Sequence, residues 1–408
     1  MTPPAHSFRD ARPPGRPSLA WALLGAIAFV VGCVLGCGRA DHSAAAATTT
    51  PPASSSQGQE GASSEYGASG TPIHLSVGYQ PYYAEAWSGV VMNDLKLWKK
   101  YLPAGSTVEF NVGLQGAIVI NAMLAGKEQI GYVGDMPGIV GATKRSVSDL
   151  RIVANIGFSN DQCNVFLTRK DAPAFESATE AVRWLDGKTV AVPKGSCTDR
   201  FAVAVYKKLG VTPKEYLNQS IELITSGFRA QKLDAAVVWE PTASRLVSEG
   251  LARRVATGND FAETDAAFID VRADLIRQRP DVVKGWLQAE LDAELYLADA
   301  KNARNVVRMV KEQTTGFDEG VLWQALFGSY PASAGGSPTR LVLPFGFTPE
   351  SLALIKRNVA FLFDVKSISV SELAPDAVVT EIADGVLKER GLTVPVGRIR
   401  AASETAAK

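Results

Sequence analysis

One candidate binding site follows the apolar run of residues 189–192, where a glycine turn, Ser196 and Thr198 lead into a predicted helix. The first turn of a helix leaves backbone N–H groups unpaired and slightly positive, and two hydroxyl groups nearby add further donors. Donors of this kind bind an oxyanion, such as a sulfonate, without a basic side chain. The structural alternative is that Ser196 or Thr198 only caps the helix.

A second corner of this kind follows the apolar run of residues 130–133. Gly134 ends the predicted strand, Asp135 is placed to cap the next helix, and Met136 lies in its first turn. In an open α/β sheet, ligands bind outside the carboxyl ends of the strands. We therefore expect these three residues to contribute to a ligand-binding site.

Aromatic, amide and acidic residues occupy the corresponding corners elsewhere in the chain. They are Gln80, Tyr82, Tyr83, Gln115, Asn160, Asp161, Trp239 and Glu240. Tyr and Trp rings give rigid walls with polar tips, and amide groups orient a small polar solute. The acids leave the charge of the ligand open: an oxyanion, a zwitterion with an ammonium group, and a neutral or cationic heterocycle all fit this set.

The elements that position these corners alternate between strands and helices. Strands are predicted at residues 73–77, 108–112, 130–133, 152–156, 165–167, 189–192 and 235–238 and near Ile221, and helices at 117–124, 181–185, 198–208, 280–300, 303–310, 318–326 and 349–361. This alternation predicts an α/β fold with a largely parallel sheet that is covered on both faces.

Residues typical of catalysis, metal binding and nucleic-acid binding are scarce in the expected fold. Of three histidines only His74 lies there, on an alternating strand, so no Ser-His-Asp set can be assembled. His74, Cys163 and Cys197 lack the spacing of a metal site, and Lys194, beside a glycine turn, is interpreted as a solvated lysine. The 42 basic and 42 acidic residues balance, which gives no indication of nucleic-acid binding. We therefore expect a solute-binding protein without catalytic activity, cofactor or metal.

Four segments carry a resemblance to a known family. They are Val-Gly-Tyr-Gln-Pro-Tyr-Tyr at 77–83, Gly-Tyr-Val-Gly-Asp-Met-Pro-Gly at 131–138, Val-Pro-Lys-Gly-Ser at 192–196 and Asp-Ala-Ala-Val-Val-Trp-Glu-Pro at 234–241. In this order they resemble the solute-binding proteins of nitrate, sulfonate and taurine ABC importers, over residues 72–365. The resemblance implies a type II periplasmic-binding-protein fold with two lobes, residues 72–158 with 263–400 and residues 159–262. Two crossings, near 156–161 and 258–265, would form the hinge of the cleft between the lobes.

The resemblance also implies a function and partners. Such a protein acts as a monomer that captures a small polar solute, here a sulfonate, taurine, nitrate or a related oxyanion or zwitterion. It delivers the solute to a membrane permease and its ATPase. Two alternatives of the same fold stay open: a ligand-sensing lipoprotein and a binder of a thiamine-pyrimidine precursor. The enzyme of this fold that makes the precursor needs a cysteine-rich motif, which this sequence lacks.

The amino terminus predicts export and attachment to a bacterial membrane. Three arginines precede an uncharged run, residues 19–36, which ends in Val-Leu-Gly before Cys37. This pattern resembles a lipoprotein signal, residues 1–36, with lipid added to Cys37, and Cys33 is a second candidate. An uncleaved signal anchor is the remaining alternative, because the run is close to the roughly 18-residue minimum for a membrane span. In each case the folded part would lie outside the cytoplasm, in the periplasm or at the cell surface.

Composition also marks the segments that flank the expected fold. Residues 37–71 are rich in Ala, Ser, Thr, Gly and Pro and predict a flexible tether. Residues 401–408 predict a loose tail.

Cys163 and Cys197 are the two cysteines within the expected fold. In an oxidising compartment they either pair in a disulfide or remain buried thiols. A disulfide would close a loop of about 34 residues, for which chain entropy gives roughly 3–4 kcal/mol of stability.

Overall fold

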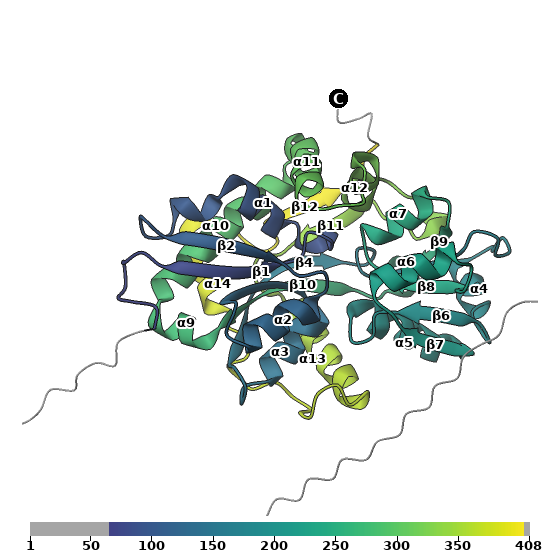
Figure 1. Cartoon of the computed structure of the whole chain (residues 1–408), viewed down its shortest axis with the longest axis horizontal. Helices are drawn as coiled ribbons and strands as arrows, with labels where there is room; N and C mark the ends of the chain where they lie inside the picture. The colour runs from purple at the N-terminus through teal and green to yellow at the C-terminus, as the bar shows by residue number, and fades with distance from the viewer. Residues whose placement is uncertain (1–64, 404–408) are drawn as a thin grey trace, which may run out of the picture. The chain divides into compact units, whose positions relative to one another are not determined.

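The computed structural model describes residues 65–403 (Figure 1). The predicted signal peptide, the two candidate lipidation sites, Cys33 and Cys37, and most of the predicted tether lie outside the described residues. Within residues 65–403, no helix has both the length and the apolar character needed to cross a membrane.

A seven-stranded mixed sheet forms the core of what we call lobe 1, in the order β12-β11-β4-β10-β3-β1-β2. Its strands are β1 His74–Tyr79, β2 Thr107–Val112, β3 Ile130–Gly134, β4 Leu150–Ser159, β10 Asp265–Arg272, β11 Thr339–Leu343 and β12 Gly397–Arg400. β1 pairs in parallel with β2 and β3, whereas β10 runs antiparallel between β3 and β4. The parallel strands end together, so the loops after β1, β2 and β3 gather at one edge of the sheet.

Helices form two layers on this sheet (Figure 1). α1 Ser88–Leu95, α10 Pro280–Ala298, α11 Ala303–Gln313 and α14 Glu381–Arg390 make up one layer, and α2 Gly116–Leu124, α3 Asp135–Thr143 and α13 Pro349–Asp364 the other. Shorter helices of lobe 1 are η1 Ala84–Ala86, η2 Leu97–Lys100, α9 Ala273–Gln278, η3 Ala300–Asn302, α12 Glu319–Leu326 and η4 Ala332–Ala334. Trp87 and Trp286 are fully buried in the first layer, and Ile139 and Leu354 in the second.

A five-stranded sheet, in the order β7-β6-β8-β5-β9, forms the core of lobe 2. Its strands are β5 Val165–Arg169, β6 Thr189–Val192, β7 Glu215–Asn218, β8 Ala235–Val238 and β9 Ala252–Thr257. Its helices are α4 Ala178–Arg183, α5 Cys197–Leu209, α6 Ile221–Arg229 and α7 Thr242–Ser248. Phe166, Phe201 and Tyr206 form an aromatic cluster in this core.

The chain passes between the two lobes twice. The first crossing connects β4 to β5, and the second connects β9 to β10 through the short helix α8 Gly258–Phe261. The crossings lie side by side, because Asp265 at the start of β10 pairs with Ser159 at the end of β4. The predicted α/β fold with two lobes and two crossings is therefore confirmed. The prediction of a largely parallel sheet is wrong, because both sheets are mixed and β5, β10 and β11 pair only with antiparallel neighbours.

The structure differs from the sequence-based predictions in several elements. The predicted strand near Ile221 is wrong, because α6 begins there, with the Ser220 side chain accepting a hydrogen bond from the N–H of Leu223. Residues 401 and 402, expected in a loose tail, donate backbone hydrogen bonds of 2.9 Å to Pro338 O and 2.8 Å to Phe327 O. β9, β11, β12, α1 and α14 were not predicted.

Candidate ligand-binding site

A cavity between the two lobes is lined by the strand-to-helix corners that the sequence singles out. It contains about 460 Å³ of space free of atoms, part of which is open to solvent. Lobe 1 contributes Gln80, Tyr83, Gln115, Gly116, Ala117, Gly134 and Pro137, and lobe 2 contributes Pro193, Lys194, Gly195, Ser196, Cys197 and Trp239. The volume that the centre of a water-sized sphere can reach inside this cavity is small, about 50 Å³. We call this space the site cavity.

Three helices begin at the site cavity: α2, α3 and α5. Their N-cap residues, Gln115, Gly134 and Ser196, accept no side-chain hydrogen bond from a backbone N–H of the helix that they precede. By contrast, the N-cap side chains of α6 and α12 do accept such a bond. At the start of α3, however, the Asp135 carboxylate accepts the Met136 N–H, and Pro137 has no N–H. The starts of α2 and α5 therefore leave N–H groups, with the positive end of the helix dipole, available to an anion.

The lining residues of the site cavity include no carboxylate and a single charged side chain, that of Lys194. The Lys194 ammonium lies 5.0 Å from the centre of the ring of Tyr216, a residue that does not line the cavity. The walls are aromatic: the rings of Tyr83 and Trp239 meet edge to face with centroids 6.4 Å apart. Positive charge at the cavity therefore comes from the backbone groups of the helix starts and from Lys194, beside aromatic surfaces that suit a short apolar chain.

Direct hydrogen bonds hold the two lobes together beside the site cavity. Trp239 Nε1–H of lobe 2 donates to Tyr82 O of lobe 1 at 3.1 Å. The backbone N–H of Ala84 donates to Glu240 O at 3.0 Å. These bonds hold the cleft in a closed arrangement.

The hydroxyl groups at the start of α5 do not point free donors into the site cavity. Ser196 Oγ donates to Pro193 O at 2.5 Å and lies 2.6 Å from Thr198 Oγ1. Because the single Ser196 proton is used on Pro193, Thr198 donates to Ser196. Thr198 is fully buried and does not line the cavity. Neither predicted role, ligand donor or helix cap, describes these hydroxyls; the backbone N–H groups of the helix start are the donors that remain.

The remaining candidate residues lie outside the site cavity, although several are close to it. Asp135 is fully buried, and its carboxylate accepts hydrogen bonds from Met136 N–H and Asn358 Nδ2, both at 2.7 Å. Met136 packs in the lobe 1 core with Phe268. Tyr82 is half-buried, and its hydroxyl accepts a 3.1 Å hydrogen bond from Thr315 N–H.

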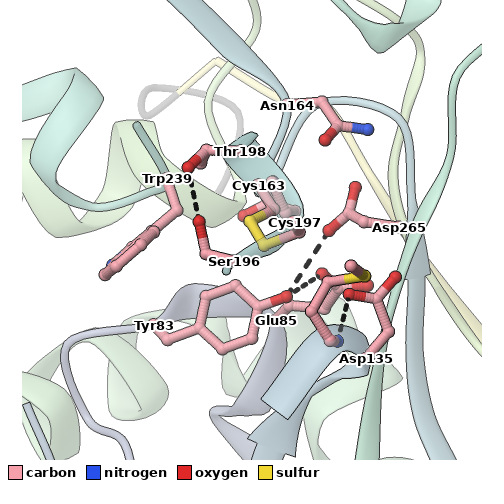
Figure 2. The surroundings of a disulfide bond; sticks show 12 residues. Tyr83, Glu85, Asp135, Cys163, Asn164, Ser196, Cys197, Thr198, Trp239 and Asp265 are labelled. Carbon is pink, nitrogen blue, oxygen red and sulfur yellow. Dashed lines mark hydrogen bonds between the residues drawn. A yellow bond between two sulfur atoms is a disulfide. The ribbon is translucent and has the colours of Figure 1, made fainter. Parts of the chain in front are cut away.

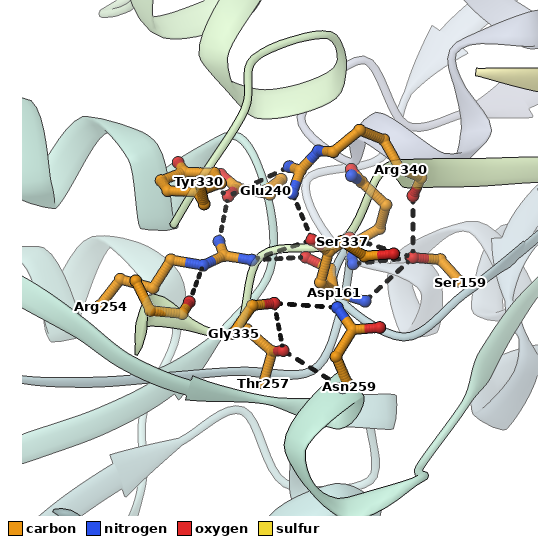
Figure 3. A network of polar contacts seen from close by, with 12 residues as sticks. Ser159, Asp161, Glu240, Arg254, Thr257, Asn259, Tyr330, Gly335, Ser337 and Arg340 are labelled. Carbon is orange, nitrogen blue, oxygen red and sulfur yellow. Dashed lines mark hydrogen bonds and ion pairs between the residues drawn. The ribbon is translucent and has the colours of Figure 1, made fainter. Parts of the chain in front are cut away.

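Asp161 and Glu240 belong to a buried ion network rather than to the site cavity (Figure 3). Asp161 pairs with Arg340 and with Arg254, and Glu240 pairs with Arg254 at 2.7 Å. Their charges are therefore already matched within the protein. Asn160 lies beside them at the first crossing, where its carbonyl oxygen packs against Gly258.

Of the candidate residues from the sequence, the structure brings six to one cavity: Gln80, Tyr83, Gln115, Gly134, Ser196 and Trp239. The sequence analysis does not include Ala117, Pro137 and Pro193, and it interprets Lys194 only as a solvated residue. Pro137 and Pro193 carry a usable signal, since each follows an apolar strand within four residues and lies at a helix start or turn.

A disulfide links Cys163, just before β5, to Cys197 at the start of α5 (Figure 2). The Cα atoms of these cysteines are 6.1 Å apart. The two sulfur atoms and a carboxylate oxygen of Asp265 lie within 4.8 Å of one another. A disulfide provides no thiolate, so this cluster offers no thiolate ligand to a metal in the paired form.

Comparison with known proteins supports this description of the fold. The chain is 26% identical over 219 residues to the taurine-binding periplasmic protein of Escherichia coli (strain K12), a match covering 51% of this chain and 64% of the relative. The matched region thus spans less than two thirds of that relative.

Two solved structures share the fold. The alkanesulfonate-binding protein SsuA from Xanthomonas axonopodis pv. citri, bound to MOPS, aligns with a TM-score of 0.59 and 19% identity, over 76% of this chain and 98% of that one. The desulfurization enzyme DSZB aligns with a TM-score of 0.55 and 17% identity, over 78% and 99%.

The family model described as the NMT1-like family matches residues 69–311. This region contains every residue that lines the site cavity and both crossings. The chain belongs to the NMT1-like family.

Proposed function

We propose that this protein captures a small oxyanion, preferably an alkanesulfonate, in the site cavity and delivers it to the permease of an ABC importer. The observation that carries the proposal is the convergence of the starts of α2 and α5, both without side-chain caps, on a cavity that has no lining carboxylate. The aromatic pair Tyr83 and Trp239 suits the short carbon chain of a sulfonate. A similar relative and a structural neighbour are named for binding taurine and alkanesulfonate.

The cavity also gives a reason to favour an anion over a zwitterion or a cation. Asp135, Asp161 and Glu240, the acids considered for an ammonium group, are bonded within the protein and do not line the cavity. We propose binding rather than catalysis, because the cysteine of the cavity lining is held in a disulfide and no histidine is among the lining residues.

A thermal-shift screen of the purified protein tests this proposal. We expect ethanesulfonate to raise the melting temperature more than taurine at equal concentration, because taurine brings an ammonium group without a partner in the cavity. At a concentration of 100 times Kd, a ligand stabilises the folded state by about 2.7 kcal/mol. Nitrate and an aminopyrimidine complete the screen, in Tris buffer, since sulfonate buffers would compete. A larger shift with the aminopyrimidine, or with an amine that carries no oxyanion, would contradict the proposal.

Import and sensing predict different phenotypes for the same binding activity. If the protein supplies a permease, a strain without it loses ethanesulfonate uptake. If it reports to a receptor, uptake stays unchanged and the transcriptional response to ethanesulfonate is lost. We propose import.

We also propose that the protein is held at the outer side of a bacterial membrane by lipid on Cys37. Stable attachment needs at least two acyl chains, because one chain alone gives marginal, reversible binding. Cys37→Ala is expected to block processing or to shift it to Cys33. Mass spectrometry of the mature amino terminus measures this, and an unlipidated Cys37 in the natural protein would contradict the assignment.

A further inference from the structure

Two carboxyl groups, those of Glu85 and Asp265, lie buried directly beneath the aromatic wall of the site cavity (Figure 2). The hydroxyl of Tyr83, which lines the cavity, donates a 2.5 Å hydrogen bond to Glu85 Oε2. The same hydroxyl lies 3.4 Å from Asp265 Oδ2. A residue of the cavity wall is therefore fixed from below by two acids.

The pair lies where the two crossings leave lobe 1. Asp265 is the first residue of β10 and pairs with Ser159, the last residue of β4. Glu85, in η1, packs so closely on Gly157 of β4 that a Cβ there would lie 2.3 Å from Glu85 Cγ. The carboxyl pair thus connects the cavity wall to both strand ends at the crossings.

The surroundings do not balance two negative charges. Asp135 and Asp161 add further negative charge near Glu85, and Asp135 does so near Asp265. Burial raises the pKa of Asp265 and the positive charge of Arg200 partly opposes this rise, but Arg200 already pairs with Glu263 at 2.8 Å and donates to Thr264 O at 2.6 Å. Two ionised carboxylates that are buried together are strongly unfavourable.

The hydrogen-bond pattern indicates that one of these two carboxyl groups is protonated. Within residues 65–403, Glu85 Oε1 and Asp265 Oδ1 have no hydrogen-bond donor. Both carboxyl groups lie within 3.4 Å of the Tyr83 hydroxyl, whose single proton can serve only one of them, so a proton on one acid relieves the contact. Consistently, burial raises the pKa of Glu85 to about 7. Burial, followed by the neighbouring charge of Glu85, raises the pKa of Asp265 well above its usual range.

We propose that Glu85 and Asp265 form one buried proton-binding site beneath Tyr83, and that its proton is required for tight binding of an anion in the site cavity. This inference rests on the proposed function for the identity of the anion. Loss of the proton would add an unbalanced negative charge under the anion and beside the crossings. Anion binding and proton binding are then coupled, and each strengthens the other.

The first experiment measures Kd for ethanesulfonate by calorimetry between pH 6 and pH 9, in Bis-Tris and Tris. In the natural protein we expect Kd to rise above pH 7 by up to about tenfold per pH unit, the limit for one linked proton. Glu85→Gln keeps an acceptor for Tyr83 without an ionisable group, so its Kd should vary less than about twofold over this range. A natural protein with a pH-independent Kd would overturn the inference.

Glu128→Gln is the matched control. Burial raises the pKa of Glu128 to about 7 as well, but this residue precedes β3 and does not line the site cavity. It should retain the pH dependence of the natural protein. If Glu128→Gln removed the dependence, the effect would come from general titration of lobe 1, and the inference would fail.

A second experiment needs no ligand and separates this inference from the proposed function. Carboxyl-carbon NMR of the ligand-free protein at pH 6 should show a protonated acid whose signal disappears in Glu85→Gln, together with a shift of the Asp265 signal. Ionised signals for both residues at pH 6 would overturn the proton site, even if ethanesulfonate binds. If ethanesulfonate failed to bind at any pH while the protonated signal was present, the proposed ligand class would be wrong and the proton site itself supported.

Discussion

Methionine in place of Arg254 is expected to lower the free energy of unfolding by about 3–5 kcal/mol. Arg254, on β9, donates to Glu240 Oε1 at 2.7 Å and lies 3.3 Å from Asp161 Oδ2 (Figure 3). Both acids are buried, so removal of the arginine leaves negative charge without compensation in a medium of low dielectric constant. The large effect measures the cost of breaking the network, not the net value of the ion pairs.

Arg254 also connects the lobes away from the site cavity. Its Nε–H donates to Ala334 O at 3.1 Å, and its guanidinium lies 4.1 Å from the centre of the Tyr330 ring. Ala334 and Tyr330 lie between α12 and β11, in lobe 1. The variant should therefore loosen this inter-lobe contact as well as unbalance the charges.

Urea unfolding at pH 7 measures the effect, with Lys284→Met as the control. Lys284 pairs with Glu389 at 2.6 Å, but both side chains are about half exposed, at 46% and 49%. Exposed pairs contribute at most about 1 kcal/mol. If the two variants changed stability equally, the network around Arg254 would not have the cost that its burial implies.

The sequence predicts the strands of both lobes well where local pattern and burial agree. β6 and β8 are predicted to the residue, since each is an apolar run between turn residues. β9 is missed because Arg253 and Arg254 interrupt the apolar pattern. The Arg254 charge is balanced by Glu240 and Asp161, from distant parts of the chain, which no local pattern reveals.

The sequence predicts which strand-to-helix corners meet at the site cavity, but it does not predict where their side chains point. A strand-to-helix corner brings the backbone to the cavity, and Gln115, Gly134 and Ser196 lie there as predicted. The direction of a polar side chain depends on partners far along the chain. Asp135 turns to Asn358, which lies 223 residues later.

The acid pair beneath the cavity is a second feature that the local sequence pattern does not predict. Glu85 and Asp265 were not identified as functional candidates, since neither lies in a motif. They become neighbours only when η1 packs across the ends of β4 and β10. Within residues 65–403, one buried carboxylate oxygen of each acid has no hydrogen-bond donor, and only the folded structure reveals this.

Aspartate in place of Ser196 is expected to weaken the binding of ethanesulfonate on the order of 100-fold. Ser196 is the N-cap of α5 and lines the site cavity. A carboxylate at this position would accept hydrogen bonds from the N–H groups of the helix start, which are the donors proposed for the anion. It would also repel the ligand: two unit charges about 5 Å apart interact by about 3 kcal/mol at an effective dielectric constant of about 20.

The same substitution should not destabilise the protein without ligand. The natural Ser196 side chain accepts no hydrogen bond from a backbone N–H of α5, although the Thr198 hydroxyl donates to it, and a carboxylate keeps an acceptor for that hydroxyl. An aspartate cap close to the positive end of the helix dipole stabilises a helix by up to about 1 kcal/mol. A weaker affinity with an unchanged or higher melting temperature is the signature of an anion site built from the helix start. A merely damaged fold would lower both.

Ser220→Asp is the matched control for this prediction. Ser220 is the N-cap of α6 in the same lobe, but its side chain already bonds to the Leu223 N–H and it does not line the site cavity. Calorimetry should give this variant the Kd of the natural protein. Equal losses of affinity in the two variants would assign the effect to the net charge of lobe 2. An unchanged Kd in Ser196→Asp would show that the anion is not held at the start of α5, which leaves the start of α2 as the group of donors to test next.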